Sequence, residues 1–121
     1  MANIDRIMGR ICVDKAMSRH VGKMEEMYTP MGMLYNQYGK DLSKIDCVIG
    51  TGGVLVHNEN PERILSAVEY SMSKGLELRP RYPKYMLDKD YILAAMGLLA
   101  EIDPMLSLKI MKKHIVPLRN N

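Results

Sequence analysis

The chain has 121 residues, of which 47% are hydrophobic, and its formal net charge is +3. This length suits one domain, and this hydrophobic content predicts a packed core rather than a disordered chain. A weak positive charge without a basic stripe argues against a nucleic-acid partner, and the lack of an apolar run of about 20 residues argues against a membrane span.

The two cysteines, Cys12 and Cys47, lie far apart in the sequence. They form no Cys-x-x-Cys motif and no metal-ligand spacing with the three histidines, so we expect no metal site. We expect both to be reduced thiols in the core. The sequence also shows no signal peptide, which predicts a cytoplasmic protein.

The first half of the chain predicts one long helix and two short strands. Residues 4–28 have apolar side chains at helical spacing, and Pro30 would end this helix. Residues 33–38 could form a short strand. Residues 45–49 are mostly apolar and β-branched, and glycines follow them, which predicts a buried strand. Residues 54–56 are expected to be extended or coil.

The second half is expected to be mostly helical. Asn60 and Pro61 predict the start of a helix that runs to about residue 73. Residues 76–87 contain two prolines and predict a connector. Two more helices are expected at 88–101 and 104–114; Asp88 and Asp90 would cap the first, and Asp103 would cap the second. In the first of these helices, the side chains expected to point inward are Tyr91, Ile92, Ala95, Leu98 and Leu99. The prediction is an α/β fold with about four helices and a small sheet.

A cluster of small residues, Gly50, Thr51, Gly52 and Gly53, follows the strand predicted at 45–49. Glycine lets the backbone turn sharply and lets a ligand approach without a Cβ in the way, while threonine adds a hydroxyl. This pattern is typical of a loop that lies against a purine, a ribose or a phosphate. A tight turn after a strand explains the bare pattern equally well.

Three nucleotide motifs can be compared with this cluster. A Walker A loop is absent, because Asp41 stands where a serine or threonine must follow Gly39-Lys40. A dinucleotide fingerprint is disfavoured, because Leu55 stands at its third glycine and the next predicted helix starts only near Pro61. The third motif is the adenosine-contact loop of the actin and Hsp70 type of ATPase. There a strand ends in a small glycine cluster and a later helix closes the subdomain.

Four segments around the glycine cluster favour the third motif, and they stand in the order 19–22, 39–42, 48–55 and 87–100. Together they resemble the C-terminal end of the glutamate (methylaspartate) mutase accessory protein family, over residues 10 to 115. The resemblance implies a partial actin/Hsp70-like (ribonuclease H-like) ATPase lobe. It also implies a chaperone-like reactivating factor, whose partner is an adenosylcobalamin-dependent mutase such as glutamate mutase or an aminomutase.

By this resemblance, Gly50, Thr51, Gly52 and Gly53 would contact the adenosine part of ATP or ADP. Members of the family are several times longer, and their phosphate loops and magnesium-holding acidic residues have no counterpart in this sequence. We therefore expect residues 1–121 to be a single lobe, the C-terminal nucleotide-contact subdomain of a longer ATPase-type protein. Nucleotide binding should be weak, and no catalytic residue is assigned.

The alternative function is a protein-interaction module that keeps the fold and binds no nucleotide. A lobe without its other half would expose apolar surface, and exposed apolar patches promote association. A homo-oligomer is therefore expected under both hypotheses.

Overall fold

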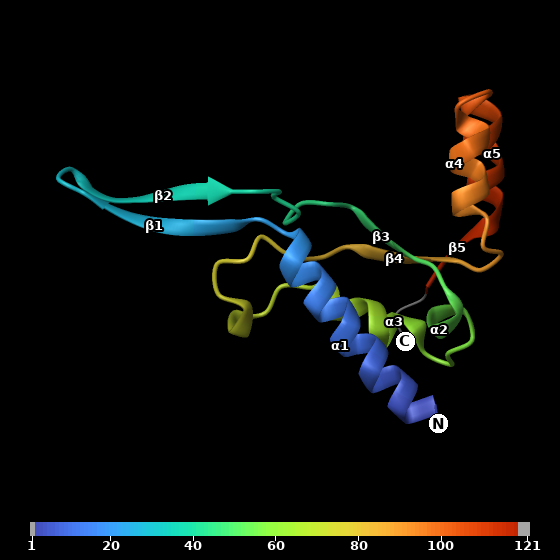
Figure 1. Cartoon of the computed structure of the whole chain (residues 1–121), viewed down its shortest axis with the longest axis horizontal. Helices are drawn as coiled ribbons and strands as arrows, with labels where there is room; N and C mark the ends of the chain where they lie inside the picture. The colour runs from blue at the N-terminus through green and yellow to red at the C-terminus, as the bar shows by residue number, and fades with distance from the viewer. Residues whose placement is uncertain (1, 119–121) are drawn as a thin grey trace.

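The computed structural model describes residues 2–118. Within this range the chain forms five α-helices and five β-strands, and the strands make two separate small sheets. A body contains the second sheet and helices α1 to α3, while the β1–β2 hairpin and the α4–α5 pair project from it (Figure 1). The predicted mixed α/β fold is confirmed, with one helix more than the four expected and two sheets instead of one.

The first helix, α1, spans Ala2–His20, so the prediction of a helix through residue 28 is wrong. Residues Lys23–Thr29 form β1, which pairs antiparallel with β2, Gly32–Tyr38. The strand predicted at 33–38 is therefore confirmed. The two strands extend well away from the body (Figure 1).

Gly22 explains why the helix gives way to a strand. A Cβ at Gly22 would lie 2.5 Å from the backbone oxygen of Tyr38, so only glycine fits at this crossing. Its N–H donates to the backbone oxygen of Lys40 at 2.7 Å, which closes the base of the hairpin. Met24 and Met27 have helical spacing, but pairing with a second strand overrides such a local preference.

The second sheet has the order β3-β4-β5, formed by Cys47–Gly50, Lys84–Asp88 and Ile115–Pro117. β3 and β4 are parallel, and β4 and β5 are antiparallel. The strand predicted at 45–49 is confirmed with slightly shifted bounds. β4 was predicted to be part of a connector, because Pro83 precedes it; proline is compatible with the edge or start of a strand, so that inference is wrong.

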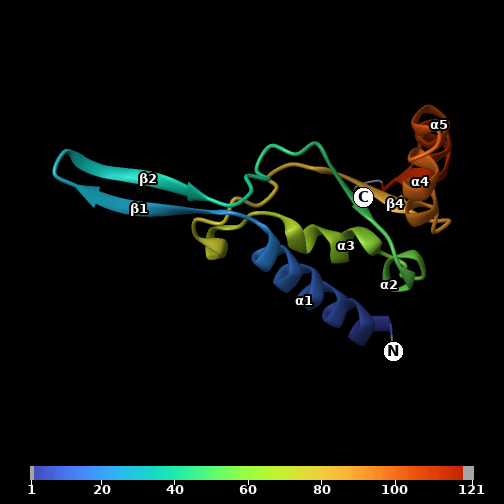
Figure 2. The same cartoon turned by 45° about the horizontal axis from the view of Figure 1, so that its top comes forward.

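The core lies where α1, α2 (Gly53–Val56) and α3 (Pro61–Leu65) cover one side of β3 and β4 (Figures 1 and 2). Its buried apolar side chains are Leu55, Ile64, Leu65, Val68, Tyr85 and Leu87, and Val13 and Met17 of α1 pack against them. Residues 54–56 are thus helical, so the prediction that they are extended or coil is wrong.

The helix predicted from Pro61 to about residue 73 ends at Leu65, and short 3-10 turns follow at Ser66–Val68 and Met72–Lys74. Contacts with a distant segment explain the break. The Arg79 guanidinium donates to the backbone oxygen of Ala67 at 3.0 Å, and the Tyr70 N–H donates to the backbone oxygen of Pro80 at 2.8 Å. These carbonyl and amide groups are therefore not used in a continuing helix.

The last two helices, α4 (Leu93–Ala100) and α5 (Pro104–His114), pack against each other. The predicted helix 104–114 and its Asp103 cap are confirmed, since the Asp103 carboxylate accepts the Leu106 N–H at 3.1 Å. α4 starts five residues later than predicted. Its Leu98 side chain is 72% exposed and Tyr91 is 50% exposed, so the prediction that both point inward is wrong.

Candidate functional site

The glycine cluster forms the connection between β3 and α2. Gly50 ends β3, and Gly53 begins α2. Gly50 is buried, and a Cβ on it would lie 2.7 to 2.9 Å from side-chain atoms of Leu55 and Leu65. Gly50 is thus required for the packing of the core beneath the loop.

Gly52 is the apex of the connection. Its φ of +102° is one that residues with side chains rarely adopt, and a Cβ on it would meet no atom within 4 Å. The backbone at Gly52 therefore faces open space. Such an open, glycine-only position is suited to close approach by a ligand.

Thr51 is tied to the neighbouring strand through Asp88. The Thr51 hydroxyl donates to the Asp88 carboxylate at 3.1 Å, and the N–H groups of Ile92 and Leu93 donate to the same carboxylate at 3.0 and 3.1 Å. Burial disfavours the charged form of Asp88, but these three hydrogen bonds outweigh it and hold its pKa below the ordinary 3.8. Asp88 thus accepts two N–H groups at the start of α4, although Ile92 and not Asp88 holds the N-cap position, and it also anchors the glycine loop.

Asp90 does not share the capping role expected for it. Its carboxylate contacts the Nδ1 atom of His114 at 3.0 Å, on the exposed side of the α4–α5 pair.

His57 and Tyr91 form the rim of the loop on the side of α4. The Tyr91 hydroxyl lies 3.3 Å from the His57 Nε2 atom, and a Cβ on Gly53 would lie 3.9 Å from the same hydroxyl. Tyr91 has a φ of +56°, which is uncommon for an aromatic residue. Backbone strain of this kind often accompanies functional sites.

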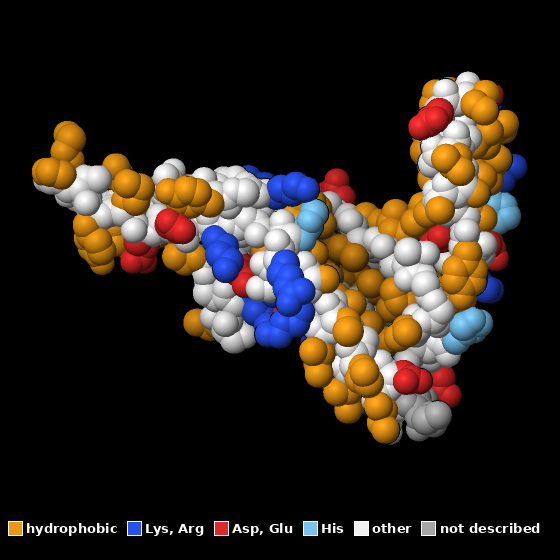
Figure 3. Space-filling view, in the orientation of Figure 1, with side chains coloured by type: hydrophobic (Ala, Val, Ile, Leu, Met, Phe, Trp, Pro, Cys, Tyr) orange, Lys and Arg blue, Asp and Glu red, His pale blue; other side chains and the backbone are white. Residues whose placement is uncertain are grey.

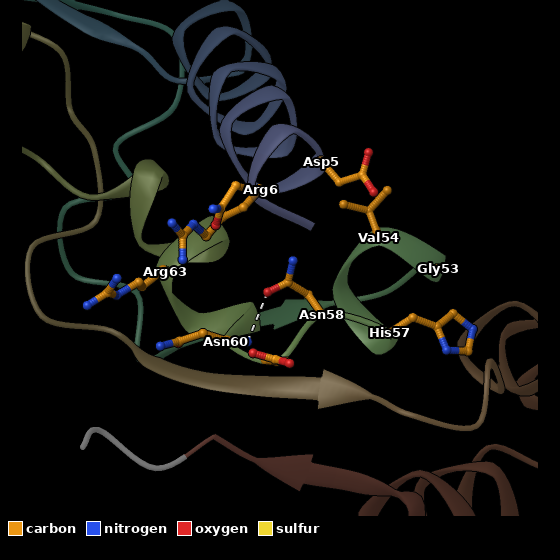
Figure 4. Close-up of a pocket in the computed structure, with 10 residues that line it drawn as sticks. Asp5, Arg6, Gly53, Val54, His57, Asn58, Asn60 and Arg63 are labelled. Atoms are coloured by element: carbon orange, nitrogen blue, oxygen red, sulfur yellow. Dashed lines mark hydrogen bonds between the residues drawn. The ribbon is translucent and has the colours of Figure 1, made fainter. Parts of the chain in front are cut away.

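A polar cavity of about 570 Å³ opens beside Gly53, between the start of α1 and the α2–α3 connection (Figure 4). Its charged side chains are of both signs: Asp5, Arg6, Glu59 and Arg63. Arg6 and Arg63 point to the same side of the cavity, away from Gly53 (Figure 4). This mixture does not form a dedicated polyphosphate clamp.

Asn58 organises the floor of this cavity. Its side-chain oxygen accepts the Asn60 N–H at 2.9 Å, and this hydrogen bond is drawn in Figure 4. The Asn60 side chain, predicted to cap α3, makes no capping hydrogen bond. Pro61 does begin α3 as predicted.

A second cavity of about 400 Å³ lies on the other side of Val54, between α1 and the loop. Its lining is mainly apolar and includes Met8, Cys12 and Val13 from α1, with Thr51 from the loop. Val54 and Asp5 line both cavities.

Cys12 is exposed on α1, so the prediction that it lies in the core is wrong; Cys47 is half-buried.

Sequence reasoning found the loop but missed most of its surroundings. Asp88 was assigned only a capping role, and Tyr91 was assigned an inward position on a helix rather than a place beside the loop. The contacts of Asp88 with Thr51 and of Tyr91 with His57 join residues far apart in the chain, and such contacts leave no local signal. Among residues 2–118, no three His, Cys, Asp or Glu side chains gather closely enough to hold a metal ion. No helix in that range has the length and apolar character needed to cross a membrane.

Comparison with known proteins adds a family assignment to this geometry. The family model described as MutL protein matches residues 1–115. Protein MutL of Clostridium tetanomorphum is 54% identical over 112 residues, which are 93% of this chain and 24% of that protein. The chain thus spans about a quarter of the length of this relative. No solved structure matches the chain.

Proposed function

Because the chain belongs to the MutL protein family, we propose that it is the nucleotide-contact lobe of an accessory protein that serves an adenosylcobalamin-dependent mutase. Glutamate mutase is the favoured partner, and an aminomutase is the related possibility. In this proposal the lobe has the actin/Hsp70-like fold and contributes one wall of a nucleotide cleft. The complete accessory protein would use ATP to reactivate a mutase whose cobalamin is damaged.

The observation that carries the nucleotide proposal is the open backbone at Gly52. Its two chain neighbours line the two cavities, Thr51 the apolar one and Gly53 the polar one, and this arrangement suits a nucleoside, which has an apolar base and a polar sugar. We propose that the adenine ring packs in the cavity beside Met8 and Val54. The ribose and the first phosphate would then lie along Gly52 and Gly53, where no Cβ intrudes.

Binding by this lobe alone should be weak. The polar cavity holds carboxylates as well as guanidinium groups, so it offers little net attraction to a polyphosphate. Each missing hydrogen bond to a charged phosphate costs about 1.5–3 kcal/mol, and roughly 1.4 kcal/mol is tenfold in affinity. An affinity for ADP in about the millimolar range is therefore expected.

A titration of ADP followed by amide NMR shifts tests the site. The parent chain is compared with Gly52→Ala and with Gly32→Ala. Gly32 is a matched control, because its φ is +120° and a Cβ there also meets no atom within 4 Å, but it lies at the tip of the hairpin. Both alanines should cost stability through the same backbone strain, of about 1–3 kcal/mol.

Shifts should cluster at residues 50–54 in the parent and in Gly32→Ala, and they should be lost in Gly52→Ala. If saturating ADP moves no signal near the loop, or if both variants bind equally well, the nucleotide proposal is refuted.

Cys12 provides a second readout that needs no substitution. It is exposed and lines the apolar cavity, whereas burial and then the nearby Asp46 charge raise the pKa of the Cys47 thiol. Cys12 should therefore react with iodoacetamide faster than Cys47, since the thiolate is the reactive form. ADP should slow alkylation of Cys12 and leave that of Cys47 unchanged. Equal rates for Cys12 with and without ADP would argue against a base in this cavity.

ATP hydrolysis gives a further prediction. Incubation of the chain with ATP and magnesium should release no phosphate above background, because phosphoryl transfer needs a metal and positioned charges. Dose-dependent turnover by the purified chain would contradict this expectation. Mixing with a separately produced N-terminal part of a MutL protein is the complementary measurement, and turnover should appear only in the mixture.

A second candidate function is an interaction module without nucleotide. The α4–α5 pair favours it, because Leu98 is 72% exposed and Ile102 is 85% exposed. Exposed apolar side chains of this kind mark binding surfaces. Co-sedimentation of the chain with an adenosylcobalamin-dependent glutamate mutase, measured with and without ADP, separates the two functions. If the chain binds the mutase equally well with and without ADP, and if ADP does not shift the amide NMR signals of the glycine loop, the interaction-module function is supported.

A further inference from the structure

The β1–β2 hairpin has one partly blocked edge and one open edge. At its base, the Met24 N–H of β1 donates to the backbone oxygen of Leu76 at 3.0 Å, and Lys23 forms an isolated β-bridge with Glu77. Within residues 2–118, no strand pairs with the outer edge of β2. The hairpin therefore presents β2 to solvent along its whole length (Figure 2).

The register shows which backbone groups this open edge offers. A two-residue turn joins Thr29 and Gly32, which are register partners. In antiparallel strands the partners alternate between pairs that bond each other and pairs whose N–H and C=O groups point outward. The outward pairs are Met24↔Gln37, Glu26↔Tyr35 and Tyr28↔Met33. The outward hydrogen bond from the Met24 N–H to Leu76 agrees with this assignment. On its open edge, β2 therefore offers the backbone N–H and C=O groups of Met33, Tyr35 and Gln37.

The two edges also differ in charge. β1 carries Lys23, Glu25 and Glu26, whereas β2, Gly32–Tyr38, carries no charged side chain. Charged residues on an edge strand normally prevent unwanted pairing, so β2 lacks this protection. Every residue of β2 is exposed, and hydrophobic side chains are visible along the hairpin (Figure 3). A lone two-stranded hairpin is only marginally stable in water, so it gains by adding strands.

We propose that β2 pairs antiparallel with β2 of a second copy of this chain, which makes a continuous four-stranded sheet. The open edge is self-complementary about a two-fold axis at Tyr35: Tyr35 faces its own copy, and Met33 faces Gln37 of the second copy. The neutral strands meet at the centre, and Glu25 and Glu26 of each copy remain on the outer strands. A second copy is the favoured partner for this edge, because the register pairs the outward backbone groups of Met33, Tyr35 and Gln37 without bringing like charges together. The inference does not depend on the nucleotide proposal.

A pair of matched substitutions tests the interface by sedimentation of the 121-residue chain at about 100 micromolar, in the weak-binding range. In Tyr35→Lys, two lysines would face each other across the axis, and like charges directly opposite are destabilising. In Tyr28→Lys, the same change lies on the same face of the hairpin but on the β1 edge, at a side chain that is 83% exposed. The parent and Tyr28→Lys should be dimers. Tyr35→Lys should weaken dimerisation by about tenfold or more.

Amide hydrogen exchange on the unmodified chain keeps the test independent of variant folding. The N–H groups of Tyr28 and Tyr35 both point outward, on opposite edges. Raising the protein concentration should slow exchange at Tyr35 and leave Tyr28 unchanged. A parent chain that stays monomeric at about 100 micromolar overturns the proposal. A dimer that both lysine variants weaken equally, or a dimer without protection at Tyr35, also overturns it.

Discussion

Asp88 is the residue on which the glycine loop depends most directly. Its carboxylate is 1% exposed and accepts hydrogen bonds from Thr51, Ile92 and Leu93. One side chain thus joins the end of β4, the loop after β3 and the start of α4. A change at Asp88 should alter stability and the position of the loop together.

Replacement of Asp88 by asparagine should destabilise the protein at neutral pH by about 1–3 kcal/mol, because one acceptor oxygen becomes an amide group facing buried donors. The folded protein holds the Asp88 pKa below 3.8, so this carboxylate stabilises the fold above that pH. Its contribution is lost as the pH falls through the lowered pKa. The difference in urea unfolding between the parent and Asp88→Asn should therefore be large at about pH 7 and smaller at a pH below 3.8.

The control for this prediction is Asp90→Asn, an exposed carboxylate two residues away that contacts His114. A surface pair of this kind contributes about 0–1 kcal/mol, so its removal should have little effect. A difference for Asp88→Asn that is equally large at both pH values would contradict the assigned role of the charge.

At the scale of elements, a buried arginine connects α1 to the segment that precedes β4. Arg79 is 1% exposed, and its guanidinium forms salt bridges with Asp14 of α1, at 2.9 Å, and with Glu77. Burial is the largest single influence on the pKa of Glu77 and raises it. The hydrogen bonds that Arg79 and Ser18 donate to the carboxylate outweigh burial, so the pKa of Glu77 is lowered. The network also lies at the base of the β1–β2 hairpin, where Lys23 meets Glu77.

Arg79→Met should cost about 1–3 kcal/mol, because it leaves the Ala67 carbonyl and the partly buried Glu77 carboxylate without their partner, while Asp14 keeps its salt bridge to Lys74 at 2.7 Å. The matched control is Arg81→Met, two residues away, where the guanidinium lies 4.3 Å from the centre of the Tyr70 ring. Loss of that contact should cost about 0.5–1 kcal/mol. Denaturant unfolding of both variants measures the difference, and equal losses would show that the buried network is not a main link between these elements.

At the scale of the whole molecule, the α4–α5 pair leaves much of its apolar surface uncovered. α4 contains only apolar residues and glycine, and it packs on α5 alone among the elements with substantial contacts. A helix that is apolar on all sides is normally buried. Within residues 2–118, no element other than α5 makes substantial contacts with α4, so its remaining apolar surface is uncovered.

Leu98→Lys combined with Ile102→Lys should lower the binding of a fluorescent hydrophobic probe. The unfolding free energy should change by less than about 0.5 kcal/mol, because exposed positions tolerate substitution. Leu87→Lys is the contrasting variant: Leu87 is buried in the core, so a lysine there should prevent folding. Probe binding that does not change in the double variant would show that the exposed apolar surface lies elsewhere.

Local signals in the sequence were sufficient to predict the features that depend on neighbours in the chain. These are the strand near 45–49 that ends in glycines, the capped helix that begins at Pro104, and the ordered segments that identify the family. Each rests on signals within a few residues, such as a β-branched run, a capping aspartate or a proline at the first helical position.

Features that depend on residues far apart in the chain became visible only in the folded molecule. Gly22 is required because β2 crosses it, Gly50 because Leu65 packs on it, and Thr51 is held by Asp88 on another strand. Local propensities differ by about 1 kcal/mol or less, so strand pairing and burial override them. That is why the end of a predicted helix became β1 and why the end of a predicted connector became β4.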